Sequence, residues 1–108
     1  MKRVYIAGKL NADAVGYVEN MSKMIKASDE IRKMGFAVFV PCLDFICGLV
    51  IGGYKYEDYF DNNQEFLKTC DAVYLVPGWE ESKGTQREIS CAKHLGIPVY
   101  EKIEDLKR

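Results

Sequence analysis

The sequence predicts a small doubly wound parallel α/β sheet, flavodoxin-like or Rossmann-like, with about four strands and helices on both faces. Three observations lead to this fold class. Short apolar, β-branched runs alternate along the chain with longer segments whose apolar residues recur with a helical period. The connections are short, so a strand, a helix and the next strand form a right-handed parallel unit. The 108 residues suffice for one hydrophobic core, and we expect a single domain over residues 1–108.

The first half of the chain indicates a strand, a helix and a second strand. Residues 3–8 are β-branched and aromatic and end at a glycine, which is typical of a strand. Residues 18–34 carry one apolar stripe that we expect to face the core, and Gly35 suits the end of this helix. Residues 36–40 indicate a second, buried strand that Pro41 stops. The apolar stripe of the helix consists of Val18, Met21, Ile25 and Ile31, with Met24 and Ser28 beside them.

Residues 42–53 leave three possibilities open. They contain an apolar run, residues 45–51, followed by the glycine pair Gly52-Gly53. The run could form a short helix, or it could form a lid with a glycine hinge. It could also form a subunit contact, because an exposed apolar patch usually marks an interface.

The next predicted helix begins at Tyr54 or Tyr56, ends at Cys70, and places a polar residue inside an apolar stripe. On a helical wheel, Asn63 lies in the middle of the stripe, whereas Asp61 points to the opposite side. A polar residue in such a place must find hydrogen-bond partners or face a polar pocket. Asn63 is therefore either a site residue or an asparagine that satisfies the backbone of a loop. The stripe around it consists of Tyr56, Tyr59, Phe60, Phe66, Leu67 and Cys70.

The last third of the chain predicts a strand, a helix and a final strand. Residues 72–76 form an apolar run that indicates the central strand. Residues 84–95 indicate an amphipathic helix, and residues 97–100 indicate a short last strand with a proline near its start. Residues 101–108 form a charged tail with room for one helical turn. In the helix, the residues expected to face the core are Ile89, Ala92 and Leu95.

The loop between the central strand and the following helix is where we expect a ligand. In open α/β sheets, ligands bind where a loop leaves the carboxyl end of a strand and enters a helix N-terminus. Glu88 lies in the first turns of this helix, where partial positive charge favours its ionised form. Such a carboxylate can act as a nucleophile or an electrostatic stabiliser, although acidic residues also occur there simply because they suit the dipole. Gly84 leaves room for a ligand to approach the backbone.

The first predicted strand ends at the same edge of the sheet. Tyr5 lies near its carboxyl end and Gly8 begins the turn. Lys9 and Asn11 follow in a loop that we expect to open beside Glu88. Taken alone, Tyr5 fits a packed core aromatic better than a site residue.

Composition excludes several classes of function. The net charge of −1 provides no electrostatic footprint for nucleic acid or an anionic membrane. The longest apolar run is far short of the roughly 20 residues that a membrane span needs. No dinucleotide-binding glycine motif follows the first strand and no Walker A sequence is present. We therefore expect no cofactor, no nucleic-acid partner and no membrane contact. Because no signal peptide precedes the first strand, we expect a cytoplasmic protein.

The cysteines do not indicate a metal or redox centre. Cys42, Cys47, Cys70 and Cys91 include no pair at the two-residue spacing of a zinc knuckle or a redox motif. The single histidine, His94, is too few to complete a usual metal site with them. We expect the cysteines to be small buried hydrophobic residues in a reducing compartment, and we expect no metal.

Three segments resemble motifs of the nucleoside 2-deoxyribosyltransferase superfamily. They are Tyr5-Ile6-Ala7-Gly8 at the end of the first strand, Cys70-Asp71-Ala72-Val73 entering the central strand, and Gly78-Trp79-Glu80-x-Ser82-x-Gly84-Thr85-x-x-Glu88 after it. The resemblance runs over nearly the whole chain. It is greatest to the short, often phage-encoded members whose function is unassigned.

The resemblance implies an enzyme that cleaves or transfers the N-glycosidic bond of a (deoxy)nucleoside or its 5′-monophosphate. Glu88 would attack the anomeric carbon, and Tyr5 would hydrogen-bond to Glu88 and orient it. This fits the chemistry, because an oxocarbenium-like transition state needs a nearby carboxylate. The resemblance also implies a homo-oligomer in which a neighbour completes each pocket. The substrate-binding residues that it implies are Gly8, Lys9, Trp79, Ser82, Gly84 and Thr85.

The chain departs from the superfamily pattern at the proton donor. Asn63 stands where the superfamily has an aspartate that serves the leaving base, and an amide cannot deliver a proton as a carboxylic acid does. Asn63 would instead orient the base, or the base would leave without an acid. The alternative is a protein on the same scaffold that binds a nucleotide without turning it over. Lys83, Arg87 or Lys9 could hold a phosphate, which favours a nucleotide over a nucleoside.

Overall fold

A computed structural model describes residues 1–107 and contains one four-stranded parallel sheet with the strand order β2-β1-β3-β4. The chain passes from β1 to β2 on one side and then crosses back to β3 on the other side of β1. The carboxyl ends of β1 and β3 therefore flank the point where the strand order reverses, which is where ligands bind in such sheets. The predicted fold class is confirmed. The strands are β1 (Arg3–Ala7), β2 (Ala37–Phe39), β3 (Ala72–Leu75) and β4 (Val99–Tyr100).

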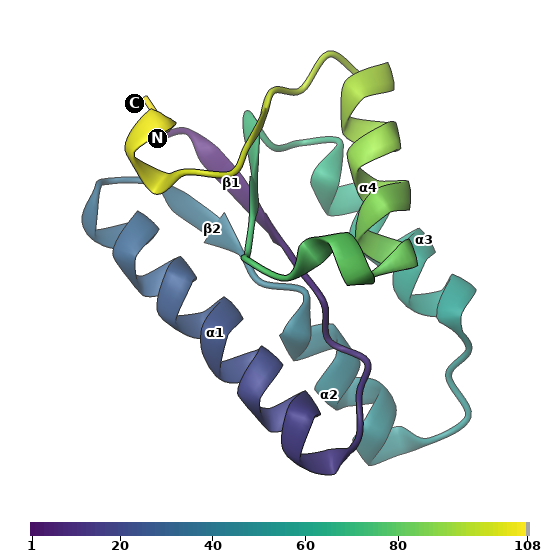
Figure 1. Ribbon diagram of the computed structural model, residues 1–108. Coiled ribbons are helices and arrows are strands. Elements are labelled where there is room, and N and C mark those ends of the chain that lie inside the picture. Colours follow the sequence, from purple (N-terminus) through teal and green to yellow (C-terminus); the bar gives the residue numbers. More distant parts are fainter. Residues whose placement is uncertain (108) are drawn as a thin grey trace.

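Helices cover both faces of the sheet (Figure 1). One helix, α1, packs on one face, whereas α3 and α4 pack on the other. The short helix α2 follows β2 at the edge of the sheet, next to the N-terminal half of α1. The helices are α1 (Ala14–Lys33), α2 (Cys42–Ile51), α3 (Tyr56–Leu67) and α4 (Lys83–His94), with 3₁₀ turns η1 (Trp79–Glu81) and η2 (Ile103–Asp105).

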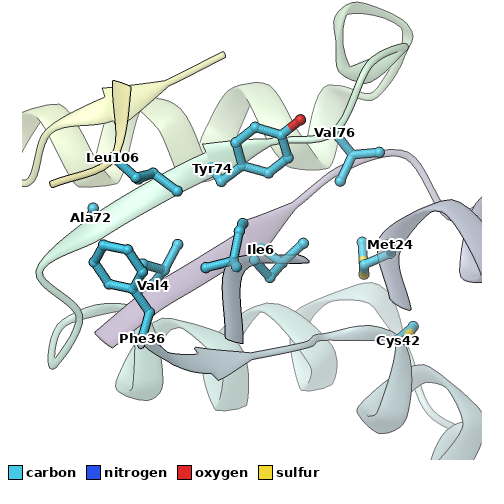
Figure 2. Packing of buried hydrophobic residues seen from close by; sticks show 10 residues of the cluster. Val4, Ile6, Met24, Phe36, Cys42, Ala72, Tyr74, Val76 and Leu106 are labelled. Atoms are coloured by element: carbon cyan, nitrogen blue, oxygen red, sulfur yellow. The ribbon is translucent and has the colours of Figure 1, made fainter. Parts of the chain in front are cut away.

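Strand β1 divides the core into two layers because its side chains alternate between the two faces of the sheet. Val4 and Ile6 pack beneath α1, whereas Tyr5 and Ala7 face the side of α3 and α4. Figure 2 shows the first layer, where side chains of β1, β3 and α1 meet. Leu106 closes this layer from the C-terminal tail and is only 4% exposed, although the tail is otherwise charged.

Helix α1 corrects two predictions. It begins at Ala14, four residues earlier than expected, because the Asp13 side chain caps it and accepts a 2.7 Å hydrogen bond from the Gly16 N–H. Its apolar stripe also does not face the core throughout. Val18 and Ile25 are 60% and 45% exposed. The side of the helix that meets the sheet is instead formed by Met24, Ser28 and Ile31.

Two further predictions of burial were wrong. Strand β2 is half-buried rather than buried, because it pairs with β1 on one side only and lies at the edge of the sheet. Leu95 is 45% exposed rather than core-facing, because α4 ends at His94 and the chain turns away at Gly96 with φ 75°.

Of the three possibilities left open for residues 42–53, the structure contains the helix. Helix α2 ends at Gly52, where φ is 82°, a left-handed conformation that favours glycine. The C-terminal tail forms the single helical turn allowed for it, η2. All four cysteines are free, but the expectation that they are buried holds only for Cys42 and Cys70, since Cys91 is half-buried and Cys47 is exposed. None of the helices described over residues 1–107 is long and apolar enough to cross a membrane.

Candidate active site

A cavity of about 450 Å³ opens at the carboxyl edge of the sheet. Its walls come from the loop after β1, the start of α2, one side of α3 and the N-terminal end of α4. The cavity has the size typical of a small-molecule site. Seven predicted site residues line it: Gly8, Lys9, Asn63, Ser82, Gly84, Thr85 and Glu88.

Glu88 lines this cavity, and Tyr5 contacts Glu88 from the buried core behind the cavity lining. Tyr5 projects from β1 toward α4 and is fully buried. Its phenol O–H donates a hydrogen bond to Oε2 of Glu88, which is 83 residues away in the sequence. Burial, followed by the nearby Glu88 carboxylate, raises the pKa of the Tyr5 phenol well above its ordinary value. Tyr5 therefore stays protonated and acts as a fixed hydrogen-bond donor to Glu88.

The protonation state of Glu88 differs from the prediction. Burial raises the pKa of the Glu88 carboxyl to about 7, and the hydrogen bond from Tyr5 opposes this rise only in part. The expected dipole effect is small because Glu88 is the sixth residue of α4, and the effect fades after the first turn. Both protonation states of Glu88 are therefore populated at neutral pH. A carboxyl with such a pKa, facing a cavity, is a candidate for chemistry.

The N-terminal end of α4 is organised around Ser82. The Ser82 hydroxyl caps the helix, accepting hydrogen bonds from the Thr85 N–H at 3.1 Å and from the Thr85 hydroxyl at 3.0 Å. A Cβ at Gly84 would lie 3.3 Å from Cε1 of Tyr56, so glycine lets this aromatic ring approach the helix. Gly8 has a packing role of its own, since a Cβ there would lie 2.9 Å from the Cβ of Val76.

Asn63 is a buried polar residue that lacks a partner. It belongs to α3, is 9% exposed, and lines the cavity. Its Oδ1 accepts no hydrogen bond from any residue between 1 and 107. One of the two expectations for Asn63, a hydrogen bond to the backbone of a loop, is therefore not met. A buried carbonyl oxygen without a partner carries a free-energy cost, and a ligand in the cavity would remove that cost.

Aromatic side chains of α2 and α3 form part of the cavity wall. Phe45 of α2 and Tyr59 of α3 stack with ring centroids 5.1 Å apart, and both line the cavity. Tyr56 and Phe60 extend this wall along α3. Sequence reasoning placed the α3 aromatics on an apolar stripe and did not include them among the site residues. The signal that identifies them was present, because they share the helical stripe that contains Asn63.

The basic residues near the cavity differ in whether their side chains line it. Lys9 and Lys83 line it, and Lys9 Nζ forms a 2.7 Å ion pair with Oε2 of Glu81. Arg87 points elsewhere: its guanidinium bonds to Glu57 at 2.7 Å and lies 3.6 Å from the centre of the Phe60 ring. Arg87 therefore braces α4 against α3 and does not line the cavity.

Trp79 is a predicted site residue that the structure places outside the cavity lining. It packs against the buried cluster beneath α4, and its indole N–H donates to Oε1 of Glu101 at 3.2 Å. The left-handed turn at Gly78, with φ 96°, precedes it. The residues described between 1 and 107 contain no cluster of three or more side chains that could hold a metal ion.

Comparisons with known proteins agree with this fold. A family model described as a domain of unknown function, DUF4406, matches residues 2–101. No curated protein matches the sequence. Among solved structures, a 2-deoxyribosyltransferase from the psychrotolerant bacterium Bacillus psychrosaccharolyticus is similar, with a TM-score of 0.68 and 24% sequence identity. The match covers 90% of this chain and 69% of the other, and it shows a shared fold.

Proposed function

The chain belongs to the DUF4406 family, a domain of unknown function, and we propose that it cleaves or transfers the N-glycosidic bond of a (deoxy)nucleoside or its 5′-monophosphate. The observation that carries this proposal is that Glu88 lines the cavity and accepts a hydrogen bond from the buried Tyr5. A protein of similar fold is a 2-deoxyribosyltransferase, which gives the proposal its reaction class. The segments around Tyr5 and Glu88 also resemble motifs of that superfamily.

In the proposed reaction, the ionised carboxylate of Glu88 attacks the anomeric carbon of the sugar. The bond from this carbon to the base nitrogen breaks, and its electron pair leaves with the base. The sugar is then held as an ester of Glu88, until a second base or a water molecule attacks the same carbon and regenerates the carboxylate. Tyr5 holds Oε2 by its hydrogen bond, which leaves the other carboxylate oxygen for attack.

The pKa of Glu88 gives the proposal a pH signature. Only the ionised carboxylate can attack, and burial raises the pKa of Glu88 to about 7. The rate should therefore rise as pH increases through about 7 and level off above it. Desolvation that raises the pKa also removes water from the carboxylate, which makes it a stronger nucleophile.

The aromatic wall and Asn63 fit the base of such a substrate. Phe45 and Tyr59 both line the cavity, and planar bases pack favourably against aromatic side chains. The Asn63 amide can accept and donate hydrogen bonds at the edge of a base, but it has no acidic proton to give. The leaving base would therefore depart without a protein acid, or with a proton from water.

The charges at the cavity mouth support a 5′-monophosphate as the preferred substrate. Lys9 and Lys83 line the cavity, and the N-terminal end of α4 opens into it. Helix N-termini with nearby lysines favour bound anions. A phosphate would compete with Glu81 for Lys9, whose present ion pair is exposed and therefore weak.

A second candidate function is binding of a nucleotide without turnover. The amide at Asn63 favours this alternative, because general acid catalysis contributes about 10²–10⁴-fold to such reactions. Tight binding with the ligand recovered intact would support it, and steady release of free base would exclude it.

Chromatography of the reaction products decides between the two candidates. The protein is incubated with deoxy- and ribonucleosides and with their 5′-monophosphates, with and without an acceptor base. Glu88→Gln and Asn63→Asp are run beside the wild type. Base release that disappears in Glu88→Gln supports the enzyme. If only Asn63→Asp releases base, the wild-type site is built for this chemistry and lacks its acid. If no variant releases base, the result favours the binding protein.

A further inference from the structure

The carboxyl groups of the cavity leave no acid for a departing base. Among the described residues that line the cavity, the carboxyl groups belong to Glu81 and Glu88. Glu88 is the proposed nucleophile and must be ionised when it attacks. Glu81 forms a 2.7 Å ion pair with Lys9, and the hydrogen bond from Lys9 lowers the pKa of the Glu81 carboxyl. Glu81 therefore holds no proton at neutral pH.

The other lining side chains with a proton to give are much weaker acids. They are the phenols of Tyr56 and Tyr59 and the ammonium groups of Lys9 and Lys83. Phenol and ammonium groups are weaker acids than carboxyl groups by about six pKa units. Burial raises the pKa of the Tyr59 phenol further, and its hydroxyl lies against Gly48 of α2. None of these groups replaces a carboxylic acid.

Asn63 offers the base a hydrogen-bond acceptor where an acid would offer a proton. Its Oδ1 is buried, and it accepts no hydrogen bond within residues 1–107. A carbonyl oxygen carries partial negative charge and interacts favourably with a positively charged neighbour. The residues that α2 and α3 contribute to the lining are four aromatic side chains and Asn63, and none of them is basic. This part of the lining therefore contains nothing that repels a cation.

A base that is already positively charged while it is bonded to the sugar needs no acid to leave. We propose that the cavity takes nucleotides whose base is a cationic heterocycle, such as an N-alkylated purine or a pyridinium ring. This inference rests on the proposed function and names the substrate class of the same site. It makes the amide at Asn63 a feature of specificity, whereas a site for neutral bases would be incomplete without an acid there.

The atoms and charges of this reaction balance without a proton donor. An ionised oxygen of Glu88 bonds to the anomeric carbon, and the bond from that carbon to the ring nitrogen breaks. The electron pair of the broken bond neutralises the ring, so the base leaves as a neutral molecule. Water then attacks the anomeric carbon, the Glu88 carboxylate is restored, and one proton of the water passes to the solvent. A neutral base would instead leave as an anion and would require a proton.

The buried Glu88 carboxylate favours the same class of substrate. Burial raises the pKa of Glu88 to about 7, and the hydrogen bond from Tyr5 opposes this rise only in part. A cationic ring bound beside the carboxylate favours its ionised form, because opposite charges attract strongly where water is excluded. A cationic substrate therefore promotes the ionisation that the attack requires, and a neutral base does not.

Two substrates that differ by one methyl group and one positive charge test the proposal. Guanosine 5′-monophosphate and its N7-methyl derivative, each with ribose and with deoxyribose, are incubated with the protein. Base release is measured above a blank without protein. We expect the methylated nucleotide to react at least about 10²-fold faster, because the neutral base lacks the benefit of an acid. Nicotinamide mononucleotide, a pyridinium nucleotide, should also release its base, since the charge and not the methyl group decides.

Asn63→Asp tests whether the missing acid sets this preference. The new carboxyl can give a proton to a neutral base, whereas a cationic base gains nothing from it. The ratio of the two rates should therefore fall by about 10-fold or more. Asn62→Asp adds the same group at the neighbouring exposed position and should keep the wild-type ratio. Circular dichroism establishes that each variant is folded.

The possible outcomes separate this inference from the proposed function. Faster release from the methylated nucleotide that disappears in Glu88→Gln supports both. Equal Glu88-dependent rates from the two guanine nucleotides, or a ratio that Asn63→Asp does not change, overturn the inference and keep the proposed function. Intact recovery of every substrate, or release that Glu88→Gln does not slow, overturns both.

Discussion

Globular proteins usually bury apolar side chains and expose polar ones, and two regions of this molecule depart from that pattern in opposite directions: the cavity, and the exposed apolar side of α1 and α2. The cavity buries polar groups, with Glu88 half-buried and Asn63 Oδ1 unpaired within residues 1–107. Helices α1 and α2 expose apolar groups such as Val50, which is 77% exposed. Each arrangement costs free energy in the isolated chain. The difference shows which contact would remove each cost: hydrogen bonds from a ligand for the polar groups of the cavity, and apolar contact for the exposed side chains of α1 and α2.

The comparison is tested most strongly by a variant that affects only one of the two regions. Glu88→Gln removes the proposed nucleophile while keeping the size of the side chain and its ability to accept a hydrogen bond from Tyr5. We expect base release to fall by about 10³-fold or more, since even an acid–base group alone contributes about 10²–10⁴-fold. Base release at the wild-type rate in Glu88→Gln would show that Glu88 is not the nucleophile.

The reverse substitution affects the other region. Ile25→Lys places a charge on the exposed side of α1 and should leave nucleotide-dependent thermal stabilisation in place, because Ile25 lies outside the cavity lining. Thermal shift with a panel of 5′-monophosphates measures this response. Loss of the response in a folded Ile25→Lys would show that the cavity depends on the apolar side of α1.

Asn63→Asp sharpens the interpretation of the cavity as a sugar-transfer site that lacks an acid. The new carboxyl would occupy the same buried position on α3, where burial raises the pKa of an acid and helps it to hold its proton. We expect base release to rise by about 10²-fold if the rest of the site is built for this reaction. Asn62→Asp, on the neighbouring exposed position, is the matched control. Equal rates in both variants would show that position 63 does not face the leaving base.

Tyr5→Phe tests whether Tyr5 positions and tunes Glu88. The phenol O–H lowers the pKa of Glu88 against the larger effect of burial, so its removal should move the rise in rate toward higher pH by about 1–2 units. The ring is kept, so the packing of this buried position is largely preserved. A pH–rate profile measures the shift. A purely structural role for Tyr5 would lower the rate without moving the profile.

The smallest expected effect is on stability. The folded pKa of Glu88, about 7, lies above its ordinary value of 4.5, so the folded state holds its proton more tightly than the unfolded state. Stability therefore falls as pH rises from 4.5 to 7, the window in which the unfolded chain ionises first. Glu88→Gln lacks this loss and should be more stable than wild type by about 1–3 kcal/mol above pH 7. Urea unfolding at several pH values measures the difference, and parallel curves at all pH values would contradict it.

Much of the fold can be predicted from the sequence, because the strands are short apolar runs that are bounded by glycine or proline residues. Parallel strands end at one edge, so Tyr5 and Glu88 could be expected to meet there, and the hydrogen bond between them is present. Its role in catalysis stays a prediction. The position of Asn63 could also be predicted, because the helical period alone places it on the buried side of α3.

Other features depend on tertiary contacts that a single sequence does not contain. The side of α1 that meets the sheet could not be chosen, because Met24 and Ile25 are equally apolar and adjacent. The pKa of Glu88 depends on burial by residues distant in sequence, which outweighs the local dipole argument. Trp79 lies in a motif that resembles a binding loop, yet its indole finds Glu101 and the cluster beneath α4.

The central claim is that Glu88 forms a covalent bond to the sugar, and intact-mass spectrometry tests it most directly. The protein is mixed with its preferred nucleoside or 5′-monophosphate, quenched in acid within the first turnover, and digested for peptide mapping. We expect a mass increase of one glycosyl group, located on the peptide that contains Glu88 and absent from Glu88→Gln. Base release that proceeds without any adduct on this peptide, at a rate unchanged in Glu88→Gln, would contradict the account.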